Sequence, residues 1–117
     1  MVPWNWMESL QKININTLAR MVEKMSELVT YESNERIALI TINRPEKMNA
    51  LSNDLVAALR DAFVQYRDSG DQCAVLTSSG DKAFSVGADI KDPPTDPDLW
   101  ECMPGVGVII DKPVIAA

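Results

Sequence analysis

Two apolar runs constrain the fold of this chain more than any other feature of its 117 residues. Residues 37–43 read IALITIN, a β-branched and nearly continuous apolar string that predicts a strand covered on both faces. The dipeptide Arg44-Pro45 should end this strand, because proline cannot donate a hydrogen bond to a neighbouring strand. Residues 73–79 (CAVLTSS) predict a second buried strand. The chain should therefore build its core around a sheet.

The segment between the two runs predicts an amphipathic helix. Its apolar positions follow a spacing of four, three, one and three: Leu55, Leu59, Ala62, Phe63 and Tyr66. Ser52 or Asn53 can cap the start of this helix, and Gly70 is a normal helix stop. A strand, a helix and a strand form a β-α-β unit, for which a right-handed parallel crossover is the default. The sequence thus favours an α/β fold.

Residues 1–28 differ from the rest and are assigned to an N-terminal extension, followed by one domain over residues 29–117. From Thr17 onward, apolar residues recur at helical spacing: Leu18, Met21, Val22, Met25, Leu28 and Val29. This pattern predicts an amphipathic helix capped by Asn16 or Thr17. A second interpretation stays open, in which Met25 is the natural start and residues 1–24 come from a misplaced start codon.

The chain contains no histidine, which excludes an imidazole base, a histidine-liganded metal and a Ser-His or Cys-His nucleophile within it. We expect no metal site. Cys73 and Cys102 lack CxxC spacing, and we interpret them as reduced structural cysteines of a cytoplasmic protein. The longest apolar stretch is far below the roughly 18 residues of a membrane span, so no membrane association is expected.

The net charge of -6 argues against nucleic-acid partners, which select clustered Lys and Arg. Most of the excess negative charge lies in residues 71–101, which contain seven acidic and two basic residues. We interpret this acidic stretch as a solvated loop rather than a cation site.

Small residues follow the second predicted strand in the segment Ser85, Gly87 and Ala88. Small side chains let a ligand approach the main chain, where backbone N–H groups can stabilise a developing oxyanion. A tight turn with no ligand is the alternative. A phosphate-binding loop is excluded, because neither GxGxxG nor GxxxxGK[ST] is present.

Four motifs together carry a resemblance to a known family. They are Asn43-Arg44-Pro45 with Lys47, Asn49-Ala50-Leu51, the stretch from Ala83 to Ile90 (AFSVGADI), and the stretch from Lys112 to Ala117 (KPVIAA). In this order and spacing the set resembles the enoyl-CoA hydratase/isomerase (crotonase) superfamily over about residues 29–117. The resemblance implies an α/β fold, the incomplete N-terminal portion of a crotonase-like spiral of β-β-α repeats.

The resemblance also implies a chemistry and a set of site residues. The substrates would be acyl-CoA thioesters, with no cofactor beyond the CoA that the substrate carries, and the full-length form would be a homotrimer or homohexamer. The residue matching Ala88 would donate one backbone N–H to the thioester carbonyl. The expected substrate and CoA contacts are Lys47, Met48, Ala50, Ala83, Ser85, Ala88, Asp89, Ile90 and Lys91.

The charged residues in and near this set have further expected roles. Lys47 is the first candidate for a phosphate contact, with Arg44, Lys82 and Lys91 as the other local cations. Asp89 is expected to hold a turn rather than to act as a base.

The chain departs from the family pattern in three places. Val86 stands where the family more often has alanine, and residues 103–110 are too rich in Pro and Gly for the usual helix. Lys112-Pro113 should launch a new buried strand at Val114 that the last residue interrupts, which predicts an incomplete domain. The segment for the second oxyanion N–H and the catalytic glutamates would lie beyond residue 117, so we expect this chain alone to be inactive.

Enoyl-CoA hydration is the default activity, and isomerase, dehydratase, dehalogenase and thioester hydrolase members share the same motifs. A non-catalytic truncated product or binding module stays open as an alternative. A doubly wound nucleotide-binding domain is a third option, which lacks the phosphate loop.

Overall fold

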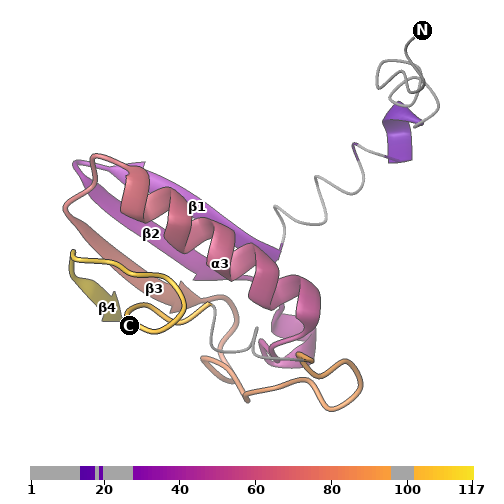
Figure 1. Cartoon of the computed structure of the whole chain (residues 1–117). Coiled ribbons are helices and arrows are strands. Elements are labelled where there is room, and N and C mark those ends of the chain that lie inside the picture. The colour runs from indigo at the N-terminus through magenta and orange to yellow at the C-terminus, as the bar shows by residue number, and fades with distance from the viewer. Residues whose placement is uncertain (1–13, 18, 20–27, 96–101) are drawn as a thin grey trace, which may run out of the picture.

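The described part of the chain is built on one mixed sheet (Figure 1). The structure is a computed structural model, which describes residues 14–17, 19, 28–95 and 102–117. Its four strands lie in the order β1 (Val29–Asn34), β2 (Ile37–Ile42), β3 (Cys73–Ser78) and β4 (Val114–Ala116). β1 and β2 are antiparallel, whereas β2, β3 and β4 are parallel. The two strands of the predicted β-α-β unit are confirmed, each ending one residue early, and so is a strand after Lys112-Pro113.

β1 is a strand that the sequence pattern did not predict. The expected helix lies largely outside the described residues, at 18 and 20–27, and its last position, Val29, is wrong because this residue begins β1. β1 joins β2 through a turn in which Glu35 and Arg36 have φ of 51° and 65°. Two-residue hairpin turns favour this left-handed backbone because it matches the twist of the strands, and they usually place Asn or Gly there. Glu and Arg are not the residues typical of such a turn, so the sequence does not predict the hairpin.

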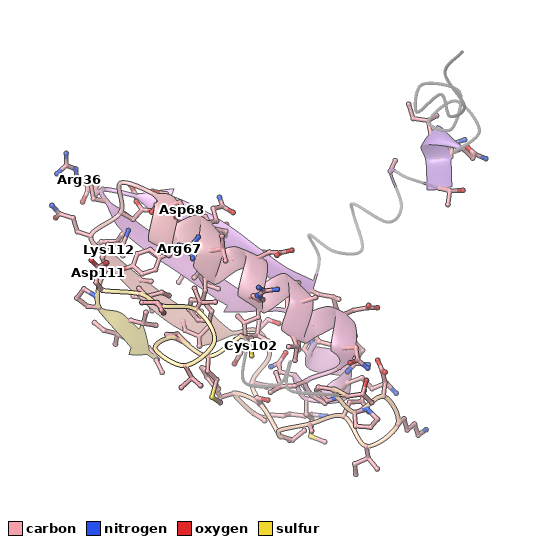
Figure 2. The ribbon with its side chains drawn as sticks, in the orientation of Figure 1. Arg36, Arg67, Asp68, Cys102, Asp111 and Lys112 are labelled. Atoms are coloured by element: carbon pink, nitrogen blue, oxygen red, sulfur yellow. The ribbon has the colours of Figure 1, made fainter. Side chains whose placement is uncertain are left out.

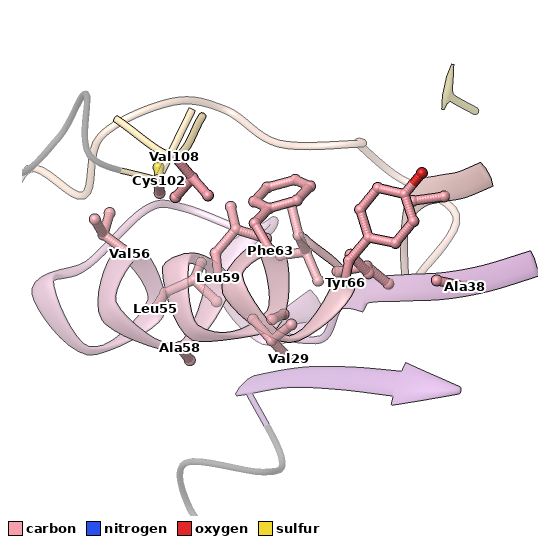
Figure 3. Packing of buried hydrophobic residues seen from close by; sticks show 14 residues of the cluster. Val29, Ala38, Leu55, Val56, Ala58, Leu59, Phe63, Tyr66, Cys102 and Val108 are labelled. Atoms are coloured by element: carbon pink, nitrogen blue, oxygen red, sulfur yellow. The ribbon is translucent and has the colours of Figure 1, made fainter. Parts of the chain in front are cut away.

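The predicted helix is confirmed as α3 (Asn53–Asp68). Ser52 caps it, since its Oγ accepts a hydrogen bond from the Leu55 N–H at 3.3 Å. The apolar face is buried over seven residues: Leu55, Val56, Ala58, Leu59, Ala62, Phe63 and Tyr66 (Figure 3). The helix ends at Ser69, whose hydroxyl donates to the Tyr66 carbonyl at 2.7 Å. Gly70 is not the cap, because it does not take a left-handed conformation.

Within residues 28–95 and 102–117, helix α3 covers one face of the sheet and part of the opposite face is exposed. Ala38, Ile40 and Ile42 of β2 pack against α3 and are at most 2% exposed. On the opposite face, Ile37 is 48% and Leu39 is 36% exposed. For the described part of the chain, the expectation of a strand covered on both faces is therefore wrong, because α3 packs on one side of β2. The same holds for β4, whose burial falls from half-buried to exposed along its three residues.

Lys112 connects the start of β4 to the end of α3 (Figure 2). Its amino group donates to the carbonyls of Tyr66 at 2.7 Å, Ser69 at 3.1 Å and Asp71 at 2.8 Å. It also lies 4.3 Å from the centre of the Tyr66 ring. A lysine at a helix C-terminus satisfies carbonyls that have no partner within the helix. One side chain thus fixes where β4 begins.

Residues 102–110 contain turns and an isolated bridge between Pro104 and Val108 and no helix, in agreement with the Pro and Gly content of residues 103–110. Cys102 and Val108 are buried near Val56 of α3 (Figure 3), so this segment covers one end of the helix. Cys73 and Cys102, both within the described ranges, form no disulfide; Cys102 is buried and Cys73 is half-buried. Within the described ranges, no helix combines the length and the apolar character that a membrane crossing requires.

Candidate acyl-CoA pocket

The loop after β2 forms the first wall of the site. It contains a short 3-10 helix (Pro45–Lys47), after which Met48 and Asn49 both adopt left-handed backbone, with φ of 51° and 57°. The Asn49 side chain is fully buried, and its Oδ1 accepts a hydrogen bond from the Arg44 N–H at 2.9 Å. Its Nδ2 donates to the carbonyls of Ser79 at 2.9 Å and Ala83 at 3.1 Å. Asn49 therefore fixes this loop against the segment that follows β3.

The second wall is the small-residue segment that follows β3. Leu51 and Ala88 form an isolated parallel bridge, in which the Leu51 N–H donates to the Gly87 carbonyl at 2.8 Å and the Asp89 N–H donates to the Leu51 carbonyl at 2.9 Å. The Ser85 hydroxyl donates to the Asn49 carbonyl at 2.8 Å. Two loops that lie far apart in the sequence are thereby held side by side.

An open pocket of about 650 Å³ lies between these walls. Its lining includes seven of the residues expected from the sequence: Lys47, Met48, Ala50, Ala88, Asp89, Ile90 and Lys91. Arg44, Glu46, Val86 and Asp92 complete it. The volume is in the range of small-molecule sites, about 300–1,000 Å³.

Ala88 is an exposed residue of the pocket wall. The N–H groups on either side are occupied, since Asp89 donates to Leu51 and Gly87 donates to the Ser85 hydroxyl at 3.2 Å. Successive N–H groups in such a bridge point in opposite directions, so the Ala88 N–H points away from Leu51. Among the described residues it has no hydrogen-bond acceptor. The arrangement leaves one backbone donor free for a ligand.

Two of the expected contact residues do not line this pocket. Ser85 is occupied by its hydrogen bonds to Asn49 and Gly87, which gives it a structural role in this structure. Ala83 lines a second, smaller pocket of about 210 Å³ together with Lys82. Of the nine predicted residues, seven therefore line the larger pocket, Ala83 lines the smaller one, and Ser85 lines neither.

Arg44 and Asp89 form an ion pair across the walls, with Nη1 2.7 Å from Oδ2. The same nitrogen donates to the Ala50 carbonyl at 3.0 Å. The Asp89 Oδ1 accepts the Lys91 N–H at 2.9 Å, the turn-holding role expected for this residue. The hydrogen bond from Arg44, followed by that from the Lys91 N–H, lowers the pKa of Asp89 below its ordinary value. Arg44, one of the local cations named from the sequence, is thus paired with Asp89.

Lys47 and Lys91 remain as exposed cations of the pocket, without an ion pair in residues 28–95 and 102–117. Glu46 and Asp92 are the acids beside them. Asp92 accepts a hydrogen bond from the Asn53 side chain at 2.8 Å, which draws it toward the start of α3.

Comparison with known proteins now defines the family. The sequence model of enoyl-CoA hydratase/isomerase matches residues 32–97, more than half of the chain. The chain belongs to this family. It is 37% identical over 90 residues to (E)-benzylidenesuccinyl-CoA hydratase of Thauera aromatica, a match that covers 74% of this chain and 33% of that relative. It is 40% identical over 65 residues to crotonyl-CoA hydratase of Syntrophomonas wolfei, covering 55% of this chain and 25% of the relative.

Solved structures of enoyl-CoA hydratase/isomerase proteins share this fold. A carnitinyl-CoA dehydratase from Mycobacterium avium matches with a TM-score of 0.64 and 36% identity, covering 76% of this chain and 36% of that one. An enoyl-CoA hydratase from Mycobacterium tuberculosis matches with a TM-score of 0.61 and 27% identity, covering 76% and 38%. The predicted partial crotonase fold is confirmed. The chain spans about a quarter to a third of the length of the curated relatives it matches.

Proposed function

We propose that residues 29–117 form the acyl-CoA-binding part of an enoyl-CoA hydratase/isomerase, in which the Ala88 N–H donates to the thioester carbonyl oxygen. The observation that carries this proposal is the Ala88 donor, which lacks an acceptor in the described part of the chain and lies on the wall of a ligand-sized pocket. The small alanine side chain leaves room for a thioester to reach the main chain.

The chemistry fits a chain without histidine. When a thioester becomes an enolate, negative charge gathers on the carbonyl oxygen, and a fixed N–H donor stabilises it. One such donor raises the rate by roughly a hundred- to a thousand-fold. The donor belongs to the backbone, and we propose no cofactor besides the CoA of the substrate.

The rest of the pocket suits the other parts of an acyl-CoA. Met48, Val86 and Ile90 are apolar side chains that are 46%, 54% and 95% exposed, available to cover an acyl or pantetheine chain. Lys47 and Lys91 offer positive charge for phosphates. The relatives named above also carry CoA thioesters in their names.

Titration with crotonyl-CoA, followed through the backbone amide signals of the ¹⁵N-labelled chain, tests the proposal. We expect the Ala88 amide to shift with crotonyl-CoA and not with free CoA, since only the thioester has the carbonyl. Signals of Lys47 and Lys91 should shift with both ligands. Binding of crotonyl-CoA that leaves the Ala88 amide unchanged would refute its assigned role, and absence of binding would refute the function.

A further inference from the structure

The Arg44 guanidinium lies between the two walls of the pocket. It contacts the Ala50 carbonyl on one wall and the Asp89 carboxylate on the other. Both charged side chains are largely buried, with 17% of Arg44 and 13% of Asp89 exposed. This pair is therefore part of the pocket's interior rather than of its solvated rim.

Asp89 occupies an electrostatically sensitive position. It directly follows Ala88, whose N–H would face developing negative charge on a bound thioester oxygen. A carboxylate close to that oxygen opposes the charge, and poor access of water increases the effect. An ionised Asp89 without a partner would therefore counteract the donor beside it.

The spacing of the walls does not depend on Arg44 alone. The Leu51 bridge holds them through two backbone hydrogen bonds, at 2.8 and 2.9 Å. The hydrogen bond from Ser85 to the Asn49 carbonyl adds a third connection. Beyond these contacts, Arg44 adds its hydrogen bond to the Ala50 carbonyl and its positive charge at the Asp89 carboxylate.

We propose that Arg44 is a positioning residue that neutralises the Asp89 carboxylate beside the Ala88 N–H, so that the pocket can polarise a bound thioester. This inference rests on the proposed function. An electrostatic role of Arg44 differs from a purely structural role because the two single substitutions should change the polarisation of the thioester in opposite directions. Removing either partner breaks the same contact, but removing Arg44 leaves a negative charge beside the substrate oxygen, whereas removing Asp89 leaves a positive one.

Crotonyl-CoA labelled with ¹³C at the thioester carbonyl tests this difference in the 117-residue chain. A polarised carbonyl moves its ¹³C signal downfield on binding. We expect Arg44→Met to lose at least half of the downfield shift seen with the unmodified chain, and Asp89→Asn to retain or increase it. The double variant R44M/D89N, which carries neither charge, should recover most of the shift. R67M is the matched control, because Arg67 pairs with Asp68 on the exposed surface of α3.

The outcomes separate the two proposals. A full shift in R44M, equal losses in both single variants, or a double variant that binds without a shift would overturn the role of Arg44. If R44M fails to fold, the double variant and D89N decide by the same criteria. No binding by the unmodified chain would refute the proposed function, and the inference would fall with it.

Discussion

Replacing Asn49 tests whether one buried amide holds the two walls of the pocket together. Its side chain makes three hydrogen bonds to backbone groups, at 2.9, 2.9 and 3.1 Å, and none of the side chain is exposed. Each neutral hydrogen bond contributes about 1 kcal/mol net. Its left-handed backbone, with φ of 57°, adds about 1 kcal/mol of steric cost for alanine. We therefore expect N49A to lower the free energy of unfolding by about 4 kcal/mol.

Urea unfolding followed by circular dichroism measures this change, and a second variant separates its two parts. N49G loses the amide but adopts left-handed backbone readily, so it should be less destabilised than N49A by about 1 kcal/mol. N34A is the control, because Asn34 is exposed at the end of β1 and should change stability by less than about 0.5 kcal/mol. A loss below about 1 kcal/mol in N49A would show that the amide does not secure the loop.

Two further predictions concern the polar contacts at the other end of α3. K112M removes a charged donor from three carbonyls and should cost about 2–3 kcal/mol in urea unfolding, whereas K82M, at an exposed lysine, should cost almost nothing. Hydrogen bonds from Ser33 and then Tyr31, both at 2.6 Å, lower the pKa of Asp71. A carboxyl whose pKa is lowered by folding stabilises the native state above its unfolded pKa of about 4, and this contribution disappears as pH falls through the folded pKa. D71N should therefore flatten the decline of stability below about pH 4, and an unchanged decline would contradict this account.

The parts of the fold that are encoded locally could be predicted from the sequence. The alternation of buried strand and amphipathic helix located β2, α3 and β3 because side-chain periodicity is a local property. The β1–β2 hairpin could not be predicted, because its turn places Glu35 and Arg36 where Asn or Gly is usual. The exposure of one face of the sheet could not be predicted either, because an apolar run indicates a buried strand without identifying the element that packs on each face.

The site divides in the same way. Seven lining residues were predicted from the family resemblance. The pairing of Arg44 with Asp89 joins positions 45 residues apart, so it depends on the fold that brings the two loops together. Asn49 gave a weak signal, because Asn tolerates left-handed backbone in loops. That its side chain connects the two loops can be seen only in the folded structure, where it donates hydrogen bonds to the carbonyls of Ser79 and Ala83.

The free donor at Ala88 belongs to the main chain, which has a consequence for genetic experiments. Alanine scanning does not remove this N–H group. Substituting a larger side chain at this position would test steric crowding of the pocket rather than the loss of a hydrogen bond. Replacing the amide by an ester through chemical ligation would remove the donor and keep the methyl group. A deep mutational library would thus measure how much side-chain volume residue 88 tolerates. It would not measure the electrostatic contribution of the Ala88 backbone N–H.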